Sequence, residues 1–216
     1  MKQICFTLLA CVCLQGLYAQ KIIEKHIDFS QGQFVSLNIQ IADSIRIITW
    51  NKNEVYVKAS VDINDDKYDS LYNFTFDGTG SSISIKAKFA DHMPPRIYNH
   101  DTCCCNYTSK IYCNVYVPEN ARFSVETIDG NITITGRTEE VKAHSISGFI
   151  DMAMAPERGA DLRLKTITGT IYSNLAIAAE KHNHSSTSDI SDAYNGGGKS
   201  VELETISGNI FLRKAE

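Results

Sequence analysis

Along much of this chain, hydrophobic and polar residues alternate with a period of two. The segment "FVSLNIQI" places Leu37, Ile39 and Ile41 on one face, and "EVYVKASV" does the same with its valines. Such alternation is typical of half-buried β-strands. No stretch shows the 3.6-residue period of an amphipathic helix. The pattern therefore predicts an all-β protein.

A short motif, [Ser/Thr]-Ile-x-Gly-x-Ile, recurs in the second half of the chain. Its copies begin 18, 21 and 39 residues apart, and the last gap is about twice the others. We therefore expect a degenerate fifth copy in between, at "SSTSDI". The repeat positions are Thr127, Gly130, Ile132, Ser145, Gly148, Ile150, Thr166, Gly169, Ile171, Ser185, Ile190, Thr205, Gly208 and Ile210.

The face on which hydrophobic residues lie changes inside each copy. Before the first copy, Phe123, Val125 and Thr127 share one parity, whereas Ile128, Gly130 and Ile132 have the other. Because a one-residue shift turns every side chain of a flat strand to its opposite face, a bend is expected at this junction. Two short strands and a bend in about 19 residues are typical of a β-solenoid.

Stacking these units in sequence order predicts ladders of equivalent side chains. One inner column should contain Ile132, Ile150, Ile171, Ile190 and Ile210, and a second should contain Ile128, Ile146, Ile167 and Ile206. An outer ladder should contain Glu126, His144, Lys165, His184 and Glu204. The last rung ends near Leu212, so we expect an open strand edge there, which a partner strand or a second copy could extend.

The sequence predicts three segments. Residues 1–19 are expected to be a signal peptide, residues 20–118 an irregular β region continuous with the solenoid, and residues 119–216 the repeat solenoid of about five regular rungs. In the first half, "QIADSI" is interpreted as a degenerate rung with Asp43 in the glycine place, and a hairpin is expected around Gly78 and Gly80. Loops are expected at Asn64–Tyr72, Asp91–Tyr107 and Lys181–Lys199.

The beginning of the chain indicates export. Lys2 precedes an apolar run, Ile4–Leu14, and a small-residue cleavage site ends at Ala19, as in secretory signals. The run is too short to span a bilayer, and no other apolar run is long enough. Leu8–Cys11 loosely resembles a lipobox, so a lipoprotein is the alternative to export to the periplasm or cell surface. A net charge of −4 gives no reason to expect nucleic acid as a partner.

Four cysteines follow the signal: Cys103, Cys104, Cys105 and Cys113. Export favours disulfides over free thiols. Cys113 shares its parity with Ile111 and Val115, and it is expected to pair with one cysteine of the triplet, since a bridge between sequence neighbours is strained. A zinc site that includes His100 is the chemical alternative.

Neither catalytic nor cofactor-binding residues can be assigned from the sequence. The outer ladder mixes acidic and basic side chains that would pair across strands. His182 and His184 could begin a metal site, but no spacing fixes a third ligand, so a solvated loop is favoured and no metal site is assigned.

The order of the segments "SIRIITWNKNEVYVKASV", "VYVPENARFSVETIDGNITITG" and the repeated "TISGNI" units resembles the DUF4097 family of head-domain-like adhesins. These proteins are common among exported proteins of Bacteroidetes. The resemblance covers about Ser36–Leu212 and implies a right-handed parallel β-helix-like solenoid in the cell envelope. The family provides no established catalytic residue to transfer.

Together these features predict a non-enzymatic exported envelope protein, either adhesin-like or a scaffold for interactions. Its partner would be an envelope protein or a glycan, with edge-mediated self-association as a further option. The alternative is a carbohydrate-active enzyme on a short β-helix.

Overall fold

The computed structural model describes residues 21–90, 108–177 and 188–215, and within them the chain is all β apart from one 3-10 turn, Asp69–Leu71. The strands are β1 (Lys21–Asp28), β2 (Phe34–Ile39), β3 (Ile41–Trp50), β4 (Glu54–Ile63), β5 (Tyr72–Asp77), β6 (Ser82–Phe89), β7 (Ser109–Pro118), β8 (Arg122–Thr135), β9 (Val141–Ser147), β10 (Ile150–Met154), β11 (Ala160–Thr168), β12 (Ile171–Ser173), β13 (Ser188–Tyr194), β14 (Lys199–Ser207) and β15 (Ile210–Lys214). The all-β prediction is confirmed. These residues contain no helix long and apolar enough to cross a membrane.

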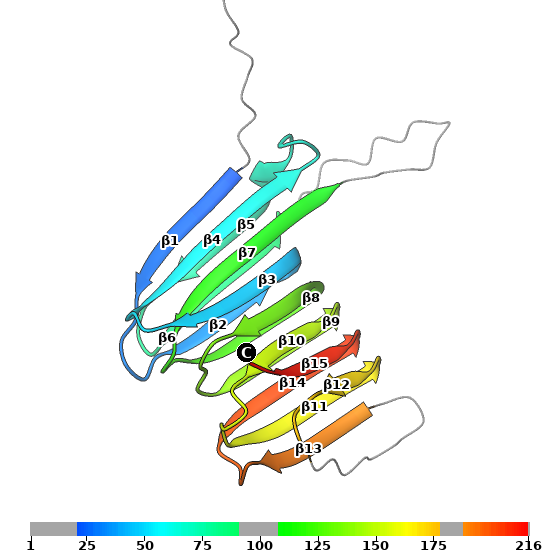
Figure 1. Ribbon diagram of the computed structural model, residues 1–216. Coiled ribbons are helices and arrows are strands. Elements are labelled where there is room, and N and C mark those ends of the chain that lie inside the picture. Colours follow the sequence, from blue (N-terminus) through cyan, green and yellow to red (C-terminus); the bar gives the residue numbers. More distant parts are fainter. Residues whose placement is uncertain (1–20, 91–107, 178–187, 216) are drawn as a thin grey trace, which may run out of the picture.

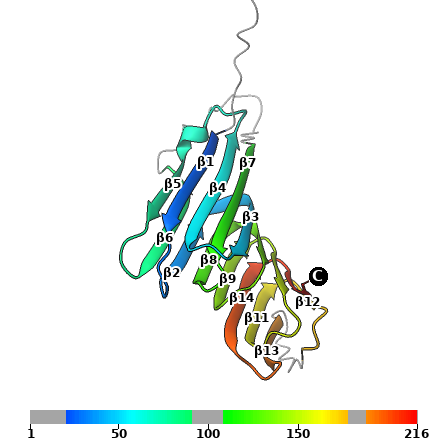
Figure 2. The ribbon, with the colours of Figure 1, turned by 60° about the vertical axis from the view of Figure 1, so that its left-hand side comes forward.

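The strands form two layers that face each other (Figures 1 and 2). Strand β8 belongs to both layers, because its first half pairs with β2 and β9 and its second half pairs with β3 and β10. The first layer has the order β5-β6-β2-β8-β9-β14-β11-β13, and the second has the order β1-β4-β7-β3-β8-β10-β15-β12. The sheet is mixed and open.

Each repeat copy forms a rung, by which we mean one strand in each layer joined by a corner. The rungs are β2/β3, the two halves of β8, β9/β10, β11/β12 and β14/β15, and their strands pair in parallel. The corner falls where the sequence parity changes, because the inward positions before it and after it then face the same core.

The spatial order of the rungs differs from the predicted one. The C-terminal rung, β14/β15, lies between β9/β10 and β11/β12 (Figure 1). The inner column therefore runs Ile132, Ile150, Ile210 and Ile171. Because all copies carry the same motif, any copy can stack beside any other, and stacking does not require that they follow sequence order.

The expected fifth copy is wrong. Ser185 lies outside the described residues, and the segment after it, β13, runs antiparallel to β11 with Ile190 opposite Leu164. Part of the expected Lys181–Lys199 loop is thus a strand. The predicted regular solenoid is not confirmed, since the C-terminal rung lies out of sequence order and β13 runs antiparallel to its neighbour.

The first half extends both layers beyond the repeats. Strands β4 and β1 add to the second layer as antiparallel neighbours of β7, and β6 and β5 add to the first layer. The hairpin expected around Gly78 and Gly80 is confirmed as β5 and β6. Ala42, and not Asp43, stands opposite Gly130; Asp43 is the extra residue of a bulge between Ala42 and Ser44.

The open edges also differ from the prediction. Leu212 lies inside the second layer, where β15 pairs with both β10 and β12. The strands at the ends of the layers are β5 and β13 in the first and β1 and β12 in the second.

Candidate functional site

The corners of the rungs are built from a buried hydroxyl and a glycine. Ser145 and Thr205 are fully buried, and their hydroxyls donate 3.3 Å hydrogen bonds to the carbonyls of Gly130 and Gly148. The Thr166 hydroxyl donates to the carbonyl of Gly208 over 2.9 Å. The first motif position is therefore a hydroxyl because it satisfies a carbonyl of the neighbouring corner.

The glycines of these corners stack closely. A Cβ atom added to Gly208 would lie 2.0 Å from the carbonyl oxygen of Gly148, and one added to Gly148 would lie 2.3 Å from that of Gly130. No real Cβ atom approaches an oxygen so closely, so the glycine of the motif is required by the approach of the adjacent corner.

The first isoleucine of each motif points outward. On consecutive strands, the residues on both sides of each isoleucine are paired, which places Ile128, Ile146, Ile206 and Ile167 level with one another. Their surfaces are 47%, 40%, 37% and 37% exposed. We call these four residues the isoleucine ladder. The predicted second inner column is therefore wrong. The hydroxyl residue just before each of these isoleucines is buried. Because side chains alternate along a strand, the isoleucine that follows it points outward, and the corner begins only after the isoleucine.

A ladder of charged side chains borders the isoleucine ladder on the first layer. It contains Glu126, His144, Glu204 and Lys165 in spatial order. Glu204 lies 3.8 Å from the Nδ1 atom of His144 and 3.6 Å from the Nζ atom of Lys165. The predicted cross-strand pairing is confirmed, but its order was wrong, and His184 lies outside the described residues. These partly exposed contacts stabilise the sheet only weakly.

Aromatic residues lie on the outer face of the second layer near the same rungs. Phe211 packs between Phe149 and Tyr172, with ring centroids 6.0 Å and 5.2 Å apart. Beside them, Arg213 forms a two-pronged ion pair with Asp151 at 2.8 Å and 2.6 Å. This row of aromatic rings thus has charged neighbours, an arrangement that resembles the apolar centre and polar rim of protein interfaces.

A second aromatic group lies on the outer face of β1, β4 and β7, where its rings pack against one another and link the strands. The rings of His26, Tyr56 and Tyr116 stack on one another across the strands, at 4.3 Å and 5.5 Å between centroids. Since ring faces contact ring faces, they do not form a flat platform on which sugar rings could stack. Tyr194 is buried and donates a hydrogen bond to the carbonyl of Pro156.

Three carboxylates meet where β4 ends, and the sequence analysis missed them. Asp62, Asp66 and Asp69 each offer an oxygen within 4.8 Å of the others, the chemistry that hard cations prefer. Partial burial and the two neighbouring carboxylates raise the pKa of Asp66. Yet these groups have structural partners: Asp69 accepts the Ile63 N–H at 2.7 Å, and Asp62 accepts the Asp66 N–H at 3.3 Å.

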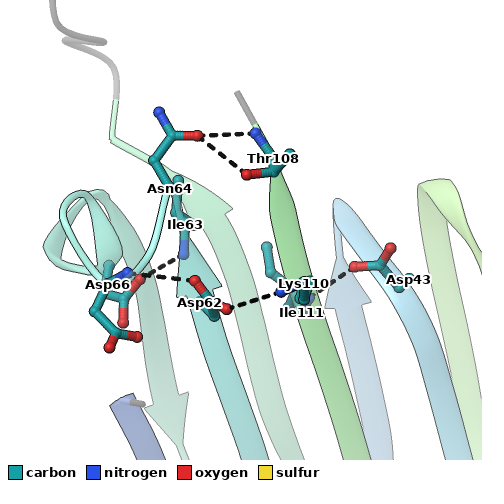
Figure 3. Close-up of polar contacts among 9 residues, drawn as sticks. Asp43, Asp62, Ile63, Asn64, Asp66, Thr108, Lys110 and Ile111 are labelled. Atoms are coloured by element: carbon teal, nitrogen blue, oxygen red, sulfur yellow. Dashed lines mark hydrogen bonds and ion pairs between the residues drawn. The ribbon is translucent and has the colours of Figure 1, made fainter. Parts of the chain in front are cut away.

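Figure 3 shows how this cluster joins the strand ends. Lys110 on β7 reaches the Asp62 carboxylate at 3.4 Å, and Asp43 accepts the Ile111 N–H at 2.7 Å. The bulge residue Asp43 thus fixes β7 against β3. The contacts of Asp62 and Asp69 close the turn after β4. The contact of Asp43 joins two strands, a role that its sequence position did not reveal.

A cleft of about 490 Å³ opens where the β10–β11 connection crosses the beginning of β14. Its charged lining residues are Glu119, Arg137, Glu139, Glu157, Arg158 and Lys199. Arg158 donates to the Thr138 hydroxyl and the Glu139 carbonyl, and partial burial lowers its pKa. Glu139 pairs with Lys199 at 2.8 Å. The charges of this cleft therefore serve largely to hold neighbouring turns together.

Cys113 lies on the inner face of β7, as its parity predicts. It has 1% of its surface exposed and no disulfide partner among the described residues, and burial raises the pKa of its thiol to about 12. No disulfide is found within the described residues. Cys103, Cys104, Cys105 and His100 lie outside them, so the proposed bridge and its zinc alternative stay predictions that non-reducing peptide mapping would test. His182 also lies outside.

The hydroxyls of the corners can be tested with a matched pair of threonines. Thr205→Val keeps the shape of a fully buried side chain but removes its hydrogen bond to Gly148, and we expect it to lower the free energy of unfolding by about 1–2 kcal/mol. Thr168→Val removes a hydrogen bond to the Ile206 carbonyl on the exposed side, where water replaces it, and should cost less than about 0.5 kcal/mol. Urea denaturation of both variants measures the difference, and equal losses would contradict the buried role of the motif hydroxyl.

Comparison with known proteins relates this arrangement to solved structures. The chain matches no described protein family, and no curated protein sequence is similar to it. A candidate cell adhesion protein from Clostridium sporogenes ATCC 15579 superposes with a TM-score of 0.55 at 10% identity, over 91% of this chain and all of that one. The two proteins share a fold. A candidate adhesin from Bacteroides fragilis NCTC 9343 covers 92% of this chain and 99% of its own, at 9% identity and a TM-score of 0.32.

At such low identity the likeness concerns the fold alone. The predicted adhesin-type architecture is supported to that extent, whereas membership of the DUF4097 family stays a prediction.

Proposed function

We propose that this is a non-enzymatic exported protein of the cell envelope that binds another protein through the isoleucine ladder, as an adhesin-like or scaffold module. The observation that carries the proposal is the outward position of four equivalent isoleucines, each between 37% and 47% exposed. Single exposed apolar residues are common on protein surfaces, but a contiguous row with charged neighbours is typical of an interaction site. Export is proposed from the signal sequence Met1–Ala19.

The chemistry of the ladder favours a protein partner over a glycan. Branched aliphatic side chains neither donate nor accept hydrogen bonds and provide no planar face for a sugar ring. An apolar strip on another protein would remove them from water and gain about 25 cal/mol for each Å² buried. A stable interface buries about 800 Å² on each partner, so the ladder would form its centre, with the charged ladder at the rim.

The test compares two double variants on the same pair of strands. Ile146→Ser with Ile206→Ser removes the centre of the ladder, whereas Lys142→Ser with Glu202→Ser removes a partly exposed ion pair of 3.4 Å from the same face. Envelope proteins retained by the unchanged protein would be identified and purified, and their affinity for each variant would be measured by calorimetry. We expect the isoleucine variant to bind at least about tenfold more weakly and the control to bind normally.

Other results would contradict the proposal. Equal binding by both variants would show that the contact lies elsewhere, and binding only to purified glycans would favour the glycan partner. Polysaccharide cleavage that is lost in Glu119→Gln would support the enzymatic alternative, since Glu119 lines the cleft beside the β10–β11 connection.

A further inference from the structure

The last segment of the chain occupies an internal place in both layers. The C-terminal rung pairs through β14 with β9 and β11, and through β15 with β10 and β12, all in parallel. Val201, Leu203, Ile210 and Leu212 of this rung are fully buried. The slot between β9/β10 and β11/β12 is therefore filled by residues that follow both of its walls in sequence.

The corner of this rung is held to both walls by main-chain hydrogen bonds of its own motif. Main-chain hydrogen bonds of 3.0–3.1 Å join Ser207 and Asn209 to one wall, at Gly148 and Ile150. Equivalent bonds of the same length join Gly208 and Ile210 to the other wall, at Thr168 and Thr170. A rung with the same sequence from another copy of the chain would reproduce every one of these contacts.

A short connection delivers the C-terminal rung to the slot. Residues Asn195–Gly198, which we call the hinge, carry the chain from β13 to β14 across the beginning of β11. All four have positive φ angles, of 49°, 85°, 81° and 154°. Fully extended, four residues would reach about 14 Å, which is enough to lead the following strand away from its own layer.

We propose that the C-terminal rung is exchanged between two copies of this chain, so that β14 and β15 of each copy fill the slot of the other. Exchange replaces each internal contact by the same contact between copies, so the conformation of the hinge and the protein concentration decide the balance. The hinge permits both states, because glycine adopts left-handed and extended backbones with similar ease.

At two of the four ends of the layers, β1 and β13, the edge strand itself opposes simple edge pairing. Edge strand β1 carries Lys21, Glu24, Lys25 and His26, and edge strand β13 carries Asp189 and Asp192. Charged residues on an edge oppose the addition of another strand. The slot instead offers two buried walls that match the C-terminal rung.

A hinge substitution tests the proposal against a matched control. Gly196 and Gly80 both have positive φ angles, of 85° and 70°, and an added Cβ would meet no atom within 4 Å at either position. Valine disfavours this backbone equally at both sites. Gly196→Val should therefore shift the protein toward an extended hinge and raise the dimerisation constant about tenfold for each hinge relieved, whereas Gly80→Val should not. Light scattering after gel filtration measures the dimer, and equal dimer fractions for both variants would overturn the proposal.

A crosslink between copies tests the exchange in proteins whose hinge sequence is unchanged. Lys142 on β9 stands directly opposite Glu202 on β14. Lys142→Cys and Glu202→Cys proteins would be unfolded, mixed, refolded at high concentration and treated with a short thiol-specific crosslinker. Each variant alone controls for the native cysteines, and the double variant shows that the pair can be linked. We expect a crosslinked dimer in the mixture and in neither single variant alone; linkage confined to single chains of the double variant would refute the exchange.

Discussion

Ile150→Asp is expected to lower the free energy of unfolding by about 4 kcal/mol or more, enough to unfold much of the protein. Ile150 is fully buried and lies between Ile132 and Ile210 in the inner column. A carboxylate there would lose its hydration and find no hydrogen-bond donor among its apolar neighbours. Since natural domains are stable by only about 5–15 kcal/mol, the loss should be visible in circular dichroism and in the urea midpoint.

The isoleucine ladder provides the control for this experiment. Ile146 belongs to the same motif copy as Ile150, but 40% of its surface is exposed. Ile146→Asp should cost less than about 1 kcal/mol, because its carboxylate stays in water. If the two variants were equally destabilised, the assignment of one isoleucine to the interior and the other to the surface would be wrong.

Gly208→Ala is expected to cost about 3–5 kcal/mol, although it adds a single methyl group. The new Cβ would lie 2.0 Å from the carbonyl oxygen of Gly148, a main-chain atom that cannot move without shifting the neighbouring corner. The cost should appear in the free energy of unfolding measured with urea.

Gly80→Ala serves as the comparison, since Gly80 has a positive φ angle of 70° but no atom within 4 Å of an added Cβ. It should cost only the backbone strain of an alanine with positive φ, about 1–2 kcal/mol. Equal costs at the two positions would mean that the stacked corners are looser than the structure indicates.

Alternation and the repeated motif were sufficient to predict most of the strands and the corners of the rungs, but not β13. The parity change at Thr127 predicted a bend, and the structure places the corner of β8 there with Gly130 as its close-packed residue. The inward position of Cys113 followed from the same alternation. These features are local, because they depend on neighbours within a few residues along the chain.

The order of the rungs could not be predicted from the motif. Each copy presents the same hydroxyl, glycine and isoleucine, so Thr205 fits beside Ser145 as well as Thr166 would. The gap of 39 residues suggested a hidden copy. Instead it contains β13, an antiparallel strand whose direction the alternation of side chains does not reveal.

The candidate site was also only partly predictable. The motif showed that Ile128 and its equivalents recur, but their exposure depends on where the corner falls relative to the outward position. Alternation shows which residues share a face of a strand, but it does not show which face is buried when both faces carry isoleucine. Exposure of the ladder therefore became visible only with the two layers in place.

The internal position of the C-terminal rung is the central claim, since the spatial order of the isoleucine ladder and the proposed exchange both depend on it. Methyl–methyl nuclear Overhauser effects in a protein with labelled isoleucines test it most directly. The structure predicts contacts from Ile150 to Ile132 and to Ile210, and from Ile210 to Ile171, with none between Ile150 and Ile171. A direct contact between Ile150 and Ile171, with Ile210 at the end of the column, would contradict it.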